Sequence, residues 1–234
     1  NIFKSDFAQF LEQEDFIYNT NEFGAGSVSR EISASLEMDA YSIVSGGRVK
    51  TRSTNEIRYL TETRLDEFRD NRFDNELFFT LSKLKLRYRP QKRTDVSYDA
   101  IIKTSEGEAE QLILSQGPEG IFNSQTLQDP RNVEVNQYLN YNKQFSYEHT
   151  STLTAFYKYE DSETKNNWFF DRPVFSDIIP FEEEGELFQL RQQIVSRIHN
   201  GRIALKHYWV LNNLNHIYPK AGVNLFDQEF GTLD

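Results

Sequence analysis

The segment from Arg48 to Leu65 alternates between charged and uncharged side chains over about eighteen residues. Its even positions are mostly Arg, Lys and Glu, whereas its odd positions, which include Val49 and Ile57, carry no charge. Successive side chains of a β-strand point to opposite sides of the sheet, so the segment predicts one long strand with a charged face and an uncharged face. Strands of about five or six residues are usual in soluble proteins. A strand of this length with two such faces is typical of a wall between water and lipid.

The composition excludes one class of membrane protein and leaves another open. Mean hydropathy is −0.67 and charged residues make up 26% of the chain. No run approaches the roughly eighteen consecutive apolar residues of a membrane helix, which excludes a helical membrane protein. The strands of a membrane barrel alternate and average out as polar, so a barrel is still compatible. The 12 Tyr, 19 Phe and 2 Trp suit either a soluble core or aromatic girdles at a membrane surface.

Other features bound the chemistry. The chain has no Cys, so disulfides, thiol nucleophiles and Cys-ligated metals are excluded. A net charge of −10 disfavours nucleic acid as a partner, because phosphate binding needs a basic surface. No cofactor motif is present, and we expect no cofactor to bind. The chain begins at Asn1 without Met or a signal segment, and we expect it to be a piece of a longer protein.

Alternation predicts an all-β fold, an antiparallel up-and-down segment of a transmembrane β-barrel with about eight long strands. Short turns are expected to alternate with long loops, the loops covering 66–75, 105–131 and 161–186. Residues 1–27 form a poorly patterned N-terminal segment, and 28–234 are assigned to the barrel, with no plug domain. The expected strands cover approximately 28–44, 48–65, 76–89, 96–103, 133–145, 152–159, 188–211 and 217–225.

The alternation changes phase at two places and is interrupted by a turn signal at a third. Ser45-Gly46-Gly47 predicts a tight turn between the first two strands. A shift of apolar parity predicts a β-bulge near Ser82. A second shift follows Asn200-Gly201, where either a two-residue hairpin or a bulge in one very long strand gives the same change of phase. Asn-Gly favours the hairpin locally, but the bulged strand better preserves the order of short and long connections, and we favour it.

Three segments resemble a known family. "KLKLRYRPQKRTDVSYDAI" (83–101), "LNYNKQFSYEHTSTLTAFYKYED" (139–161) and "LKHYWVLNNLNHIYPKAGVNLF" (205–226) are similar to barrel strands of TonB-dependent outer-membrane receptor-like proteins of Bacteroidota. The resemblance spans about 28–230. It implies a fragment of a large barrel of about 22 strands, closed around an N-terminal plug that this chain lacks.

The same resemblance implies a function and a set of partners. The whole protein is expected in the bacterial outer membrane, where it takes up a scarce, bulky ligand such as a siderophore, glycan or peptide. Its implied partners are outer-membrane lipid, the TonB system through the missing plug region, and a surface lipoprotein.

Two other functions were weighed against transport. A soluble β-sandwich binding module of the carbohydrate-binding type would also use many aromatic residues, but it needs short strands and two packed sheets. An enzyme such as a glycosidase needs two carboxylates at a fixed separation, and no motif here indicates a pair. We therefore expect no catalytic activity.

Candidate site residues follow from the expected faces. The basic residues Arg48, Lys50, Arg52 and Arg58 are assigned to a wet lumen, where they either steer an anionic ligand or, as we favour, join a cross-strand salt-bridge lattice with carboxylates such as Glu31 and Glu56. The lipid-facing candidates are Val49, Ile57, Val96, Tyr98, Leu153, Ala155 and Tyr157.

The remaining candidates are weaker. Trp168, Phe169 and Phe170 lie in the expected loop 161–186, where packing is favoured over ligand contact. The acidic residues of that loop lack the spacing of a calcium-binding EF-hand. His149, His199, His207 and His216 show no metal-binding or triad spacing, so neither a metal site nor a catalytic residue is predicted.

Overall fold

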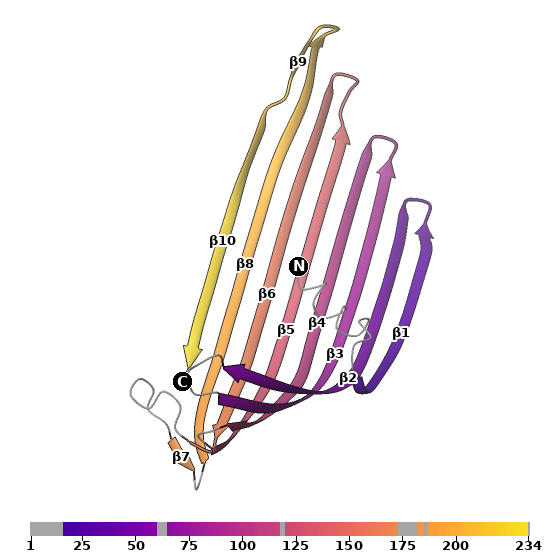
Figure 1. Ribbon diagram of the computed structural model, residues 1–234. Helices are drawn as coiled ribbons and strands as arrows, with labels where there is room; N and C mark the ends of the chain where they lie inside the picture. Colours follow the sequence, from indigo (N-terminus) through magenta and orange to yellow (C-terminus); the bar gives the residue numbers. More distant parts are fainter. Residues whose placement is uncertain (1–15, 60–64, 118–119, 173–181, 185–186, 234) are drawn as a thin grey trace.

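The structure is a computed structural model that describes residues 16–59, 65–117, 120–172, 182–184 and 187–233 (Figure 1). These residues form one antiparallel sheet in which sequence neighbours are also neighbours in space, in the order β1-β2-β3-β4-β5-β6-β8-β10. The all-β, up-and-down fold class is therefore as predicted. The strands are β1 (Phe16–Ser33), β2 (Leu36–Tyr59), β3 (Leu65–Gln91), β4 (Thr94–Gly117), β5 (Gly120–Gln144), β6 (His149–Phe170), β7 (Glu182–Glu184), β8 (Leu187–Asn212), β9 (Asn215–Ile217) and β10 (Lys220–Leu233).

Short turns at 34–35, 92–93, 145–148 and 213–214 lie at one end of the sheet, which we name the turn end. The opposite end is the loop end. In Figure 1 the turn end is uppermost, and the lower ends of β2 and β3 sweep sideways, so that the sheet is bent along its length. The strands β2 to β6 and β8 are 22 to 27 residues long, several times the usual strand length.

The register assigns every long strand two faces. Directly opposed residues of an antiparallel pair point to the same side of the sheet. The cross-strand row Ala40↔Leu84, Leu84↔Ala100 and Ala100↔Gln137 therefore lies on one side. We name this side face 2; it carries the even-numbered residues of β1–β4 and the odd-numbered residues of β5, β6, β8 and β10. Face 1 is the opposite side.

The sheet has almost no core of its own. In the described part of the chain, the buried apolar residues are Val49, which is 6% exposed, and Ala204, which is 9% exposed. The described strands make a single layer, and large apolar side chains such as Ile203 and Leu225 are more than half exposed on it. A single layer is stable only if something other than water meets its apolar side.

The predicted turn at Ser45–Gly47 is wrong. These residues lie inside β2 and pair with both β1 and β3, and the hairpin turn lies at 34–35 instead. Ile32 and Leu36, on either side of that turn, have the same parity and the same face. The alternation therefore runs through the turn unchanged, and for this reason the sequence pattern does not reveal the turn at 34–35. The segment 16–27 belongs to β1, although it was expected to be unpatterned.

Neither phase shift is a bulge or a hairpin. The pairing of β3 with β2 and β4 continues without a shift through Ser82, and β8 pairs continuously with β6 and β10 through Asn200-Gly201. The expected loops are also shorter than predicted. The segment 66–75 lies in β3, 105–131 belongs almost wholly to β4 and β5, and β6 continues to Phe170.

Candidate functional site

An apolar band crosses face 2 near the turn end. We name it the belt. On β2 it covers Leu36–Val44, nine positions along the strand, and the row Tyr157↔Gly201↔Leu225 continues it toward β10. Among the described residues of face 2 near the turn end, the charged exceptions lie at its margins, as Arg30 does on the edge strand β1. Its apolar members are Leu36, Met38, Ala40, Val44, Leu84, Leu86, Tyr88, Val96, Tyr98, Ala100, Ile102, Val133, Val135, Leu139, Tyr141, Leu153, Ala155, Tyr157, Tyr159, Ile203, Leu205, Trp209, Leu211, Ala221, Val223 and Leu225.

Toward the loop end the same face becomes charged. On β2 the belt gives way to Arg48, Lys50 and Arg52. On β4 it gives way to three consecutive face 2 positions occupied by glutamate, Glu106, Glu108 and Glu110. Face 2 thus has one apolar half and one polar half.

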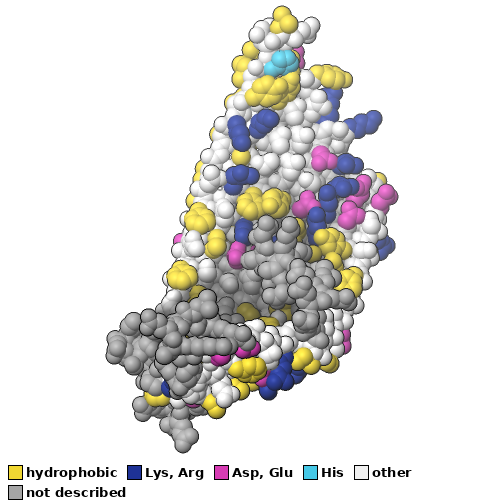
Figure 2. Space-filling view, in the orientation of Figure 1, with side chains coloured by type: hydrophobic (Ala, Val, Ile, Leu, Met, Phe, Trp, Pro, Cys, Tyr) yellow, Lys and Arg dark blue, Asp and Glu magenta, His cyan; other side chains and the backbone are white. Residues whose placement is uncertain are grey.

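Face 1 has the reverse arrangement. Near the turn end it is charged, and Figure 2 shows Lys, Arg, Asp and Glu side chains gathered over that half. Near the loop end it carries apolar residues such as Phe79 on β3 and Ile194 on β8. The two faces therefore exchange polarity partway along the strands, near 45–47 in β2 and 199–201 in β8. This exchange is the physical cause of the phase shifts in the sequence.

The charged half of face 1 is a lattice of cross-strand ion pairs. Arg89 reaches both Asp95, at 2.8 Å, and Glu37, at 3.7 Å. Farther along the sheet, Lys103 pairs with Glu134 at 3.1 Å. Both signs of charge are present on neighbouring strands, so this surface is well hydrated but nearly neutral locally.

A second lattice lies on the charged half of face 2. Arg48 donates two hydrogen bonds to Asp74, of 2.7 and 2.6 Å, and Lys50 pairs with the same carboxylate at 2.9 Å. Arg52 binds Asp70 in the same bidentate way, at 2.8 and 2.9 Å. The hydrogen bond from Arg48 lowers the pKa of Asp74 to about 2, and that from Arg52 lowers the pKa of Asp70. The favoured salt-bridge lattice is present, but its carboxylates come from a segment that was expected to be a loop.

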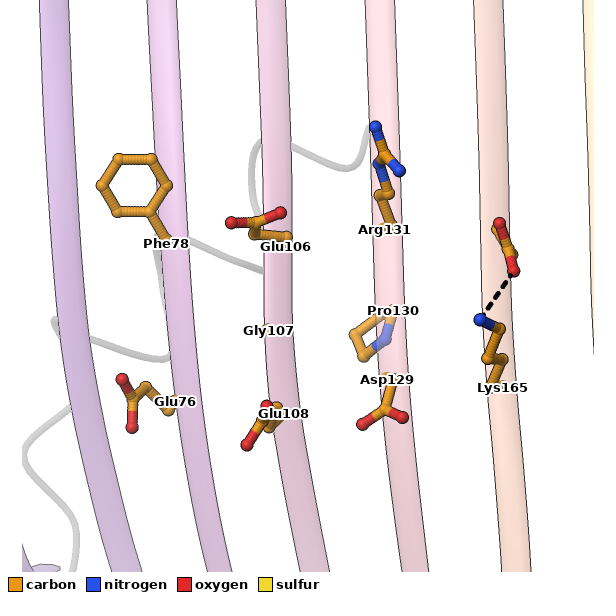
Figure 3. A pocket seen from close by; sticks show the side chains of 10 residues that line it. Glu76, Phe78, Glu106, Gly107, Glu108, Asp129, Pro130, Arg131 and Lys165 are labelled. Carbon is orange, nitrogen blue, oxygen red and sulfur yellow. Dashed lines mark ion pairs between the residues drawn. The ribbon is translucent and has the colours of Figure 1, made fainter.

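A shallow groove marks the border between the belt and the charged half of face 2 (Figure 3). Glu76, Glu106 and Glu108 point onto it from β3 and β4. Across it, Glu163 and Lys165 form an ion pair of 3.4 Å on β6. The β4–β5 pairing is interrupted between Glu106↔Arg131 and Ala109↔Gln128, beside Pro130, whose nitrogen has no proton to donate. Charge therefore begins immediately beyond the belt.

The predicted lipid-facing set does not share one face. Val96, Tyr98, Leu153, Ala155 and Tyr157 lie in the belt on face 2, whereas Val49 and Ile57 lie on face 1. Arg48, Lys50 and Arg52 lie on face 2, the same side as the belt but nearer the loop end. The assignment of these three basic residues to the side opposite Ala155 is therefore wrong, because it assumed that each face keeps one polarity throughout. The side chain of Arg58 lies outside the described residues.

Trp168, Phe169 and Phe170 are part of β6 rather than a loop. Trp168 and Phe170 lie on face 1 and Phe169 on face 2. The ring of Phe170 stacks on Phe122 of β5, with centroids 6.3 Å apart. Contact of these aromatic residues with a ligand stays a prediction.

The structure brings together two histidines that the sequence separates. His149 Nδ1 lies 3.2 Å from His207 Nε2, across the β6–β8 pair at the turn end of face 2. The two are 58 residues apart in the chain, so spacing along the sequence does not reveal them. In the described part of the chain, no group of three or more His, Asp or Glu residues is placed to hold a metal ion.

Comparisons with known proteins found distant likenesses. No family model and no curated protein matches the chain. The siderophore receptor PiuA from Acinetobacter baumannii is similar with a TM-score of 0.29 and 6% identity, and the match covers 94% of this chain and 47% of that one. OccK10 (OpdN) from Pseudomonas aeruginosa has a TM-score of 0.16 and 8% identity, with 92% and 96% of the two chains covered. The chain thus spans about half the length of the siderophore receptor. The described residues include no helix that is long and apolar enough to cross a bilayer.

Proposed function

We propose that this chain is a section of the wall of an outer-membrane β-barrel with a role in transport, and that it has no catalytic role. The observation that supports this most is the belt. Its nine positions on β2 agree with the roughly 9–11 residues that a tilted strand needs to cross the hydrocarbon of a bilayer. Every strand from β2 to β6, and β8, contributes to it.

The two charged halves fit the same arrangement. With hydrocarbon on the belt, the turn half of face 1 becomes the lumen, where the ion pairs of Glu37 and Glu134 are hydrated. The strands continue well past the belt, and there the outer side is polar because it meets water again. The turns at the turn end are two to four residues long, whereas two of the three connections at the loop end, 60–64 and 171–186, are longer, which suits a barrel with periplasmic turns and outer loops.

The alternative of a soluble sandwich lacks a second sheet in the described part of the chain, where all strands belong to one sheet. Its belt would also leave side chains such as Leu225, which is 71% exposed, in water. Contact with lipid removes the free-energy cost of leaving these apolar side chains in water.

At a finer level, we propose that the whole protein is a TonB-dependent receptor that takes up a scarce, bulky ligand. The expected partners are a plug region, the TonB system and a surface lipoprotein. This finer assignment is supported by the resemblance of 83–101, 139–161 and 205–226 to barrel strands of such receptors. Deleting the TonB system should abolish uptake; uptake that persists by diffusion would instead indicate a porin.

The absence of Cys makes the belt directly testable, because single cysteines can be introduced without a background. Three positions on β4 form a matched set: Ala100 in the belt, Ser97 on face 1 three positions nearer the turn end, and Glu108 on face 2 beyond the belt. In the whole protein reconstituted in lipid vesicles, Ala100→Cys should resist a water-soluble maleimide, whereas Ser97→Cys and Glu108→Cys should react. Equal reaction of Ala100→Cys and Glu108→Cys would exclude the bilayer as the partner of the belt.

A further inference from the structure

The ring nitrogens of the histidine pair at the turn end form a hydrogen bond, at a distance that also suits two ligands of one metal ion. Two nitrogens that bind one metal ion at about 2.0–2.1 Å with tetrahedral angles are separated by roughly 3.3 Å. The separation of His149 Nδ1 and His207 Nε2 is 3.2 Å. Both residues are half-buried and keep part of their surface exposed to solvent.

A neighbouring side chain contacts the other nitrogen of one of the two rings. Ser151 Oγ lies 2.8 Å from His207 Nδ1. When Nδ1–H donates to this hydroxyl, the lone pair of His207 lies on Nε2, the nitrogen nearer His149, where it can accept a hydrogen bond or bind a metal ion. An outer hydrogen bond of this kind fixes the tautomer of metal-binding histidines. The ring of Trp209, whose centroid is 5.4 Å from that of His149, packs on the other member of the pair.

We propose that His149 and His207 form a binding site for a divalent transition-metal ion that prefers imidazole ligands, such as Cu²⁺, Ni²⁺ or Zn²⁺. Affinity among these ions is expected to be highest for Cu²⁺. Two residues supply the protein ligands and water completes the coordination, so the ion binds reversibly and more weakly than at a three-ligand site.

The position of the pair favours contact with aqueous ions. His149 is the first residue of β6, directly after the turn 145–148. His207 is paired with Ser151, which lies two residues after His149 on β6. On β6 the pair lies beyond Leu153, the last belt residue, whereas on β8 His207 lies between the belt residues Leu205 and Trp209. The pair depends on the β6–β8 register and not on the presence of lipid.

The test is a titration of the full chain in detergent micelles with CuCl₂, followed by electron paramagnetic resonance. The wild-type chain should bind one Cu²⁺ with hyperfine coupling to two nitrogens. His149→Gln or His207→Gln should weaken this binding at least tenfold and leave coupling to one nitrogen. Ser151→Ala should weaken it about tenfold, because the ring of His207 loses its partner.

His216→Gln is the matched control. His216 Nδ1 lies 2.6 Å from the Tyr208 hydroxyl on face 1, away from the pair, so copper binding should not change. Circular dichroism of each variant checks that the sheet is retained. Copper binding that is equally strong in the wild type and in a folded His149→Gln, His207→Gln double variant would overturn the proposal. That result would leave the maleimide test of the belt unaffected.

Discussion

Replacing Ala155 with arginine tests the belt most severely. Ala155 lies near the middle of the belt on β6, and its register partners on the neighbouring strands are Leu139 and Ile203. An arginine there would project its guanidinium from an apolar surface into hydrocarbon, without a carboxylate among its direct cross-strand partners.

The expected loss of unfolding free energy depends on how deep the arginine lies in the bilayer. Arginine on the lipid face of a barrel costs about 2–4 kcal/mol at the middle of the bilayer and close to nothing near the interface. Ala155 is two positions from Leu153 and four from Tyr159, the ends of the belt on β6, so the range for the middle of the bilayer applies. A loss of 2–4 kcal/mol is roughly a 30- to 700-fold change in the folding equilibrium.

The assay is reversible unfolding of the whole barrel protein by guanidinium chloride in phospholipid vesicles, followed by tryptophan fluorescence, to which Trp168 and Trp209 of this chain contribute. Ala155→Arg should lower the unfolding free energy by the stated amount relative to wild type. In cells, the same variant should also reduce the amount of protein that is assembled in the outer membrane.

Thr154→Arg is the control, because Thr154 lies next to Ala155 on face 1 and its cross-strand partner on β5 is Asn140. Its arginine would extend into the hydrated side, with a change within about 0.5 kcal/mol. If both variants lose the same stability, the assignment of lipid to face 2 is refuted.

Two further changes test the packing and the charge lattice. Gly107→Ala would place a Cβ 2.5 Å from the Glu76 carbonyl oxygen, so it should lower the unfolding free energy by about 1–3 kcal/mol in the same assay. Gly46→Ala is the control and should be tolerated, because its nearest contact is at 3.6 Å. Equal losses for the two variants would contradict the close approach of β3 to Gly107. Asp74→Asn should cost about 1 kcal/mol at neutral pH, because the contacts to Arg48 and Lys50 are lost. Since the pKa of Asp74 is lowered to about 2 in the folded chain, its contribution is present above the unfolded pKa of about 3.9 and is lost as pH falls through about 2. The difference between wild type and variant should therefore close over that interval, and a difference that persists below it would refute the ion pair.

Much of the fold is readable from the sequence because alternation is a local property. A β-strand places every second residue on one face, so strands such as 96–103 and 152–159, and the turns near 92–93, 145–148 and 213–214, are recognised without knowing what they pack against. The same local signal predicts the all-β class and the presence of two unlike faces.

The loop ends of the strands were missed for a related reason. There face 2 is charged, but face 1 mixes polar and apolar residues, as at Ser105, Ala109 and Gln111 of β4. Such a stretch resembles a loop when it is read alone. Only pairing with β3 and β5 shows that the strand continues.

By itself, the sequence determined that this chain forms long two-faced strands, because a side chain's direction depends only on its place in its own strand. Only the tertiary structure decided which faces of neighbouring strands lie on the same side of the sheet. Register between strands establishes that the change of parity at Asn200-Gly201 is an exchange of polarity between two faces and not a bulge. Register also places His149 beside His207, since hydrogen bonding between strands, and not distance along the chain, decides which side chains meet.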